Sequence, residues 1–298
     1  MNAPPWLWVV FTLLAAIAQT FRNATQKSLI ERLGTVGATH TRFIFGLPFG
    51  LLALAAVSLT YGEMPRPNAV SFLWTAFGAM SQILATALML AAMQERSFVV
   101  TTAYTKTEPV QIALFVIIFL GEQITFTLAA AVAIATSGVL ALSWPSRAGH
   151  EIFSWRPAIL GIASGGLFAL AAVGFRGGIV ALGTPEFVPA ATVTLAISLT
   201  LQTALLSTWL LMRDPEVLRA VLRAWRPSSP AGFLGAFASE MWFLAFALAS
   251  PALVRTLGLV EVLIAGMISR RLFQQTPSIR DIIGLVLVTV GIALLFNA

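Results

Sequence analysis

Apolar runs of about 20 residues recur along the whole length of this 298-residue chain and constrain its fold more than any other feature. A helix of that length crosses the ~30 Å hydrocarbon core of a bilayer. The runs are continuously apolar and lack the alternation, in segments of about ten residues, that outer-membrane barrels show. Only 10% of the residues are charged, against roughly 25% in soluble domains. The sequence therefore predicts an all-α integral membrane protein.

Polar and Pro/Gly interruptions divide the apolar sequence into ten predicted transmembrane helices. They cover residues 5–27, 36–60, 69–93, 97–119, 125–143, 157–180, 187–212, 231–249, 251–270 and 279–296. The first run has neither a basic segment before it nor a cleavage-like site after it, so we expect it to be retained in the mature protein. Several connections are very short, which makes the helices that they join antiparallel neighbours.

Residues 213–226 carry a finer pattern between two predicted spans. Asp214 can cap a helix with Pro215 at its first position, and apolar side chains then recur at helical spacing beside several arginines. This pattern predicts a short amphipathic helix lying in the headgroup region. The alternative is a plain charged loop.

Lys and Arg residues gather in alternate connections, which indicates the orientation. The odd-numbered connections carry most of them, whereas the even-numbered connections and the termini offer little beyond Arg66 and Arg255. By the positive-inside rule the odd connections are cytoplasmic and both termini lie outside. We expect a multi-pass protein of a bacterial-type plasma (inner) membrane. Topology also accounts for the net charge of +6, so nucleic acid is not an expected partner.

The two halves of the chain show a weak internal repeat. An offset of 153 residues aligns Glu108 with Glu261, and the segment beginning at Gly138 with the segment beginning at Gly291. The predicted domains are residues 1–145 and 153–298. Five spans per half is an odd number, so the second half enters the membrane from the opposite side and the repeat is inverted. Inverted repeats suit alternating access around a site at their interface.

A family resemblance rests on a few motifs spread over nearly the whole chain. They are Arg42 in the second predicted span, Glu108-Pro109-Val110 in the fourth, the Gly121-Glu122 turn, and Gly138 and Gly291 late in the last helix of each half. With these motifs the chain resembles the ten-helix EamA-type branch of the drug/metabolite transporter superfamily, and within it is similar to the aromatic amino-acid exporters. The resemblance implies a central cavity walled by the third, fourth, eighth and ninth spans. The sequence departs from the family pattern at Glu261-Val262, where a proline is common, and at Gln274-Gln275, where a Gly-Glu turn is expected.

Ionisable residues at bilayer depth are candidate functional groups, because each costs a few kcal/mol to insert. Glu240 lies in the middle of the eighth span beside Phe237 and Trp242, where it could hold a substrate ammonium group or take up a proton. The alternative is a buried ion pair between Glu240 and an arginine such as Arg22 or Arg42.

The fourth span begins with a polar stretch that ends at Pro109. Proline removes a helical hydrogen bond, which frees a carbonyl to face a cavity. Lys106 is then a candidate for a substrate carboxylate and Tyr104 for stacking, with Gln82 as a further candidate for substrate binding. The alternative is that Lys106 snorkels to the membrane interface. Because Lys106 and Glu108 are two residues apart, we expect them not to pair with each other.

Other charged residues are predicted to gate or to form ion pairs. Glu261 repeats Glu108, and Arg255 lies near the start of the same span, so pairing between the halves is expected, with proton or ion coupling as the alternative. Arg22 and Arg176 are repeat mates, predicted to be gates or helix-packing partners. Arg42 completes this set.

These observations predict a secondary transporter that exports small metabolites, preferably amino acids with aromatic or apolar side chains, by alternating access. One alternative is a proton-coupled exporter of drug-like cations, with Glu240 as the coupling site. Another is a membrane-embedded enzyme or signalling scaffold, for which the sequence shows no clustered polar motif. Cysteine is absent, which excludes thiolate chemistry. We expect no enzyme activity, cofactor or metal, a lipid bilayer and a small-molecule substrate as partners, possible use of protons, and a monomer.

Overall fold

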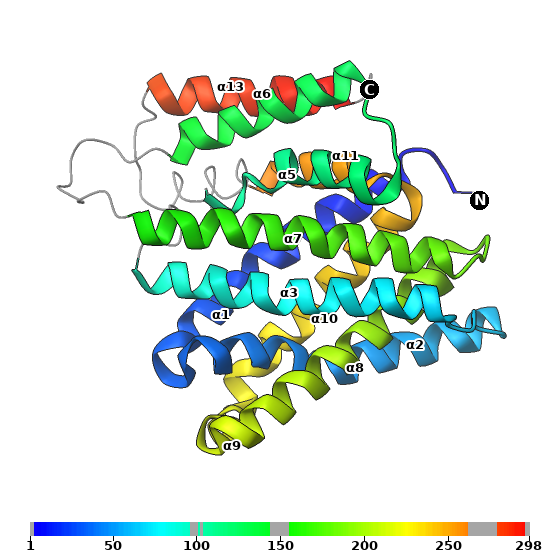
Figure 1. The fold of residues 1–298 in the computed structure, drawn as a ribbon, viewed down its shortest axis with the longest axis vertical. Helices are drawn as coiled ribbons and strands as arrows, with labels where there is room; N and C mark the ends of the chain where they lie inside the picture. The colour runs from blue at the N-terminus through cyan, green and yellow to red at the C-terminus, as the bar shows by residue number, and fades with distance from the viewer. Residues whose placement is uncertain (1–2, 96–100, 102–103, 144–154, 262–278, 296–298) are drawn as a thin grey trace.

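The computed structural model describes residues 3–95, 101, 104–143, 155–261 and 279–295, and these form helices and turns without a strand. The all-helical prediction is confirmed for this part of the chain (Figure 1). The helices are α1 (Leu7–Ile44), α2 (Leu47–Tyr61), α3 (Ala69–Glu95), α5 (Glu108–Phe115), the π-helical turn η1 (Val116–Leu120), α6 (Phe126–Ser143), α7 (Trp155–Ala181), α8 (Phe187–Arg213), α9 (Pro215–Arg223), α10 (Trp225–Leu248), α11 (Pro251–Leu257) and α13 (Ile279–Leu295).

Five described helical stretches are long and apolar enough to cross a membrane. They are Leu7–Tyr61, Ala69–Glu95, Trp155–Ala181, Phe187–Arg213 and Trp225–Leu248. The stretches Glu108–Leu120, Phe126–Ala141 and Ile282–Leu295 are apolar but shorter. The predicted count of ten spans and the inverted repeat, with its two domains, stay predictions, in part because residues 96–100, 144–154 and 262–278 lie outside the described part.

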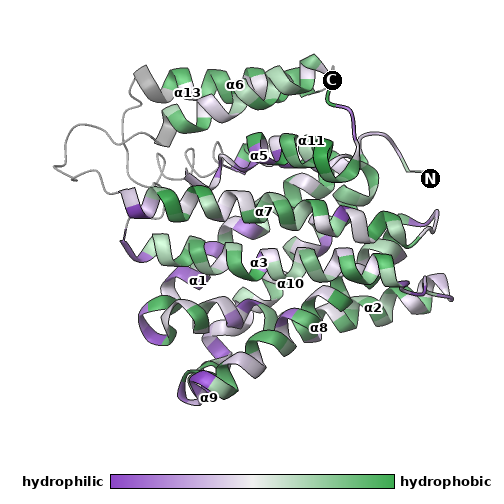
Figure 2. Cartoon of the chain, in the orientation of Figure 1, coloured by the Kyte–Doolittle hydropathy of each residue, from purple (hydrophilic) through white to green (hydrophobic). Residues whose placement is uncertain are grey.

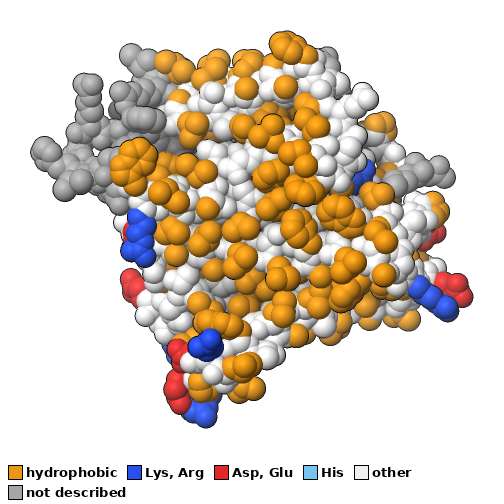
Figure 3. All heavy atoms as spheres, viewed as in Figure 1, with side chains coloured by type: hydrophobic (Ala, Val, Ile, Leu, Met, Phe, Trp, Pro, Cys, Tyr) orange, Lys and Arg blue, Asp and Glu red, His pale blue; other side chains and the backbone are white. Residues whose placement is uncertain are grey.

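The surface agrees with a membrane protein. Hydrophobic residues predominate along α2, α3, α7 and α8 (Figure 2), and apolar side chains spread across the visible face while charged ones gather mainly at its left and right edges (Figure 3). Large apolar side chains such as Leu52, Leu73 and Ile118 are exposed. An apolar band between charged edges is what a lipid environment requires.

Several predicted boundaries are wrong by a few residues. The first helix continues beyond residue 27, and the break falls at Gly34, whose φ of 67° lies in the left-handed region that favours glycine. α10 begins at Trp225 instead of residue 231, because Pro227 falls in its first turn, where a missing N–H costs nothing. Pro230 lies inside the helix. The predictions for residues 97–103 and 262–270 fall almost entirely outside the described residues.

The amphipathic helix predicted for residues 213–226 is confirmed as α9. The side chain of Asp214 accepts a hydrogen bond from the backbone N–H of Val217 at 3.2 Å, as a helix cap does. Val221 is fully buried in a cluster that includes Leu29 and Leu33 of α1. The apolar face of α9 therefore packs against the protein, which argues against a plain loop.

Glycines set the closest helix approaches. A Cβ atom on Gly174 of α7 would lie 2.7 Å from the Cα atom of Gly78 on α3, and the two helices run side by side (Figure 1). α6 packs on α13 in the same manner, since a Cβ atom on Gly138 or on Gly291 would lie within 2.7 Å of the backbone of the facing helix. Small residues let backbones approach closely in membranes.

Candidate functional site

A stripe of polar side chains on α1 forms one wall of the site. Gln19, Arg22, Asn23 and Gln26 are all buried. Their spacing of i, i+3, i+4 and i+7 puts them on one face of the helix. Arg22 donates to the Oδ1 atom of Asn23 from Nε at 3.2 Å and from an Nη atom at 2.6 Å. Sequence reasoning singled out Arg22 alone, although the same spacing on an apolar helix would have revealed the other three.

Two ion pairs connect the two halves of the chain at this stripe. Lys106 pairs with Glu261, and Nε of Arg255 lies 3.0 Å from Oε1 of Glu108. All four side chains are at most 8% exposed. Glu261 and Arg255 of the second half therefore each contact a residue of the first half, and Lys106 and Glu108 form no ion pair with each other.

Local helix geometry positions the second of these pairs. Pro109 lies in the first turn of α5, which puts Glu108 at the N-terminus of that helix. Pro251 begins α11, and Arg255 lies in the last turn of α11. A carboxylate interacts favourably with the partial positive charge at a helix N-terminus, and a guanidinium does so with the partial negative charge at a C-terminus. The two short helices therefore favour the charge that each of them presents.

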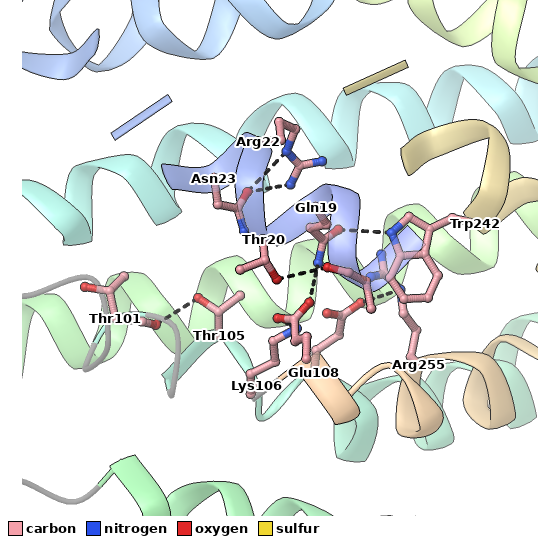
Figure 4. A network of polar contacts seen from close by, with 12 residues as sticks. Gln19, Thr20, Arg22, Asn23, Thr101, Thr105, Lys106, Glu108, Trp242 and Arg255 are labelled. Carbon is pink, nitrogen blue, oxygen red and sulfur yellow. Dashed lines mark hydrogen bonds and ion pairs between the residues drawn. The ribbon is translucent and has the colours of Figure 1, made fainter. Parts of the chain in front are cut away.

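Trp242 of α10 joins the network from a third side (Figure 4). Its indole Nε1 donates to Oε1 of Gln19 at 3.1 Å, and Nε2 of Gln19 lies 3.5 Å from Oε2 of Glu261. The guanidinium of Arg255 lies 4.2 Å from the centroid of the Trp242 ring, which is cation–π geometry. Four helices and the Glu261 segment thus converge on one buried polar network.

A small pocket opens within this network. Its lining consists of Gln19, Arg22, Asn23, Met89, Thr105, Lys106, Glu108, Phe168, Arg255 and Glu261. Both signs of charge and two apolar side chains therefore face one small space.

Arg42 lies beside this pocket and is as buried as Arg22. Its Nη atoms contact Oγ1 of Thr86 at 3.3 Å and Oγ of Ser239 at 3.1 Å. Its guanidinium lies 5.3 Å from the ring centroid of Phe43. All of these partners are uncharged.

The structure does not bring the remaining predicted binding residues to the pocket. Glu240 accepts a hydrogen bond from the hydroxyl of Thr192 at 2.6 Å. Among the described residues it forms no ion pair with Arg22 or Arg42, so that expected alternative is wrong. Phe237 is 37% exposed and stacks on Phe233 at the surface. These positions differ from the prediction because one residue step on a helix turns a side chain by about 100°.

Tyr104 and Gln82 take packing positions. The Cβ atom of Tyr104 lies against Gly161 of α7. Gln82 accepts a hydrogen bond from Nε2 of Gln202 at 2.8 Å, which ties α3 to α8. Neither residue lines the pocket.

A second polar cluster lies away from the pocket, at the C-terminal end of α10. Arg176 donates to the carbonyl oxygens of Phe246 and Ala247, and its Nε lies 3.8 Å from Oε1 of Glu122. Ser250 donates to the other carboxylate oxygen of Glu122. Glu122 follows the Gly121 turn of the first half, so this cluster also joins the two halves. In the sequence Glu122 stands out only as part of a motif, and Arg176 is predicted to be a gate or a helix-packing partner.

Comparisons with known proteins agree with this architecture. Residues 6–144 match the EamA-like transporter family. A solved crystal structure covers 96% of this chain and 98% of its own length, with a TM-score of 0.66 and 17% sequence identity, which shows a shared fold and nothing about substrate. No curated protein matches the chain. The segment 6–144, just under half of the chain, is an EamA-like transporter segment of the drug/metabolite transporter superfamily, and the chain is a multi-pass membrane protein.

Proposed function

We propose that this protein is a secondary transporter that exports small carboxylate-bearing metabolites, amino acids among them, by alternating access. The observation that carries the proposal is the buried network at the pocket, where Lys106–Glu261 and Glu108–Arg255 each join one half of the chain to the other. Ion pairs between two rocking halves can form in one state and open in another, which is how substrate binding can be coupled to a change of access.

The helix packing supports two equivalent halves. Under the offset of 153 residues α1 corresponds to α7, and α3 corresponds to α10. α1 packs along α10, and α7 packs along α3. The same pair of helices therefore meets twice, each time across the halves. Gly138 and Gly291, which are repeat mates, both lie where α6 and α13 make their closest approach.

The second polar cluster is consistent with a transport pathway that is closed at one end. Glu122, Arg176 and Ser250 bridge the halves at the turns that follow η1 and α10. Under the predicted topology these turns lie on the non-cytoplasmic side of the inner membrane. The cluster would then close the outer end of the pathway, and Arg176 would act as a gate.

The pocket favours this substrate class over drug-like cations. A cation exporter coupled through Glu240 would need that carboxylate at the pocket, whereas Glu240 contacts Thr192 instead. Met89 and Phe168 give the pocket an apolar wall, which suits an apolar part of the substrate. Aromatic amino acids, the predicted substrates, carry both a carboxylate and an apolar side chain and so belong to this substrate class.

Counterflow in proteoliposomes tests the proposal. Vesicles containing the purified protein are loaded with one unlabelled solute, diluted into the labelled form, and compared with protein-free vesicles. The panel holds phenylalanine, glutamate, succinate, glycerol 3-phosphate and a cationic dye. We expect labelled uptake for at least one carboxylate-bearing solute, and loss of it in Glu108→Gln. Counterflow of the dye alone would favour the cation exporter, and counterflow of none would overturn the transport proposal.

A further inference from the structure

The buried charges around the pocket do not balance. Among the described residues the buried charged side chains are the bases Arg22, Arg42, Lys106 and Arg255 and the acids Glu108 and Glu261. The carboxylate of Glu240, which is less buried as a whole, contacts Thr192 and pairs with neither Arg22 nor Arg42. Lys106 and Arg255 are each paired with one of the two acids. Arg22 and Arg42 remain, and they leave two positive charges without a paired carboxylate in the described part of the chain.

The contacts of both arginines are neutral and incomplete. Arg22 contacts the amide of Asn23, and Arg42 contacts the hydroxyls of Thr86 and Ser239. One Nη atom of Arg22 and the Nε atom of Arg42 are buried without an acceptor. Each side chain is 1% exposed. A buried guanidinium whose hydrogen-bond partners are all neutral is destabilising, so two of them in one region call for an anion.

The two arginines lie side by side across a glycine of α10. A Cβ atom on Gly235 would lie 2.8 Å from Cγ of Arg42 and 3.6 Å from Cδ of Arg22. Arg22 also lines the pocket. An anion that enters the pocket therefore meets Arg22 directly and lies within the field of Arg42.

We propose that the transported substrate is a small organic dianion, and that Arg22 and Arg42 form its anion subsite. This inference rests on the proposed transport function and restates its substrate class as organic dianions, which include phosphate monoesters as well as dicarboxylates. Guanidinium groups bind carboxylate and phosphate oxygens with paired, directional hydrogen bonds, so a dicarboxylate and a phosphate monoester share the required chemistry. Lys106, which the sequence suggested for this role, is already neutralised by Glu261.

The test compares solutes of different charge on the intact protein in proteoliposomes. Unlabelled succinate, glycerol 3-phosphate and phenylalanine are compared as competitors of the counterflow of a labelled solute that the protein exchanges. Comparing the two dianions shows whether the site prefers a dicarboxylate or a phosphate monoester. We expect either dianion to compete at concentrations at least tenfold below those that phenylalanine requires. Arg42→Gln should weaken that competition about ten- to a hundredfold, as loss of a charged hydrogen-bond donor predicts.

Matched variants separate binding from folding. Arg219→Gln removes an arginine from the exposed surface of α9 and should leave dianion competition unchanged. Arg42→Lys keeps the charge and should recover part of the competition that Arg42→Gln loses, while thermal unfolding in detergent reports whether each variant is folded. Counterflow of phenylalanine that exceeds that of both dianions, or competition by the dianions that Arg42→Gln leaves unchanged, would overturn the dianion inference and leave transport intact. Absence of all counterflow would instead overturn the transport function.

Discussion

Replacing Glu108 by Gln should leave Arg255 as a buried charge without its counter-ion. The two side chains are 5% and 7% exposed, and Nε of Arg255 lies 3.0 Å from Oε1 of Glu108. Removing one partner of such a pair typically costs about 3–5 kcal/mol in unfolding free energy. Arg255→Gln should cost a similar amount, and it also removes the contact with the Trp242 ring at 4.2 Å, worth roughly 0.5–2 kcal/mol.

The double variant should recover much of the loss, because neither charge is then left alone. A double-mutant cycle on Glu108→Gln and Arg255→Gln should therefore give a coupling energy of at least about 2 kcal/mol. The assay is reversible unfolding in mixed micelles, followed by helical circular dichroism. The exposed pair Glu216–Arg219 on α9 is the control, with side chains 74% and 60% exposed, and should couple by at most about 1 kcal/mol. If the losses of unfolding free energy in the two single variants add up in the double variant, the claim that Glu108 and Arg255 stabilise the protein as a pair is refuted.

Two further predictions concern packing and topology. Gly138→Ala should lower the unfolding free energy by about 1–3 kcal/mol, because its Cβ atom would lie 2.7 Å from a backbone nitrogen of α13; unchanged thermal unfolding would contradict the close approach. In the cysteine-free chain, Glu63→Cys should react with a membrane-impermeant maleimide in intact cells and Glu216→Cys should not. The opposite labelling pattern would reverse the proposed orientation.

Local features of the fold could be predicted from sequence because their causes are local. Asp214 and Pro215 begin α9 by capping chemistry that involves only neighbouring residues. Apolar length alone reveals the long helices. The end of the first helix was missed because Gly34 breaks it through a backbone conformation, and a single glycine within helical sequence does not reveal which conformation it adopts.

The site was predictable in its residue types and not in its pairings. Lys106, Glu108, Arg255 and Glu261 stand out as charges in apolar sequence, since each is costly at bilayer depth. Which charge meets which depends on how the halves dock, so the neutralisation of Lys106 could not be read from spacing. Glu240 stands out equally well in the sequence, yet the rotation of α10 directs it to Thr192.

Accessibility of the pocket from each side of the membrane tests the central claim most directly. Met89 lines the pocket and is 3% exposed, so an impermeant maleimide added to one side of oriented proteoliposomes can label Met89→Cys only when the pathway opens to that side. We predict labelling from one side at a time, protection by a transported solute, and faster labelling from the side of the Gly121 turn when Arg176→Gln weakens the second cluster. Rapid labelling from both sides at once would indicate an open channel and would contradict alternating access.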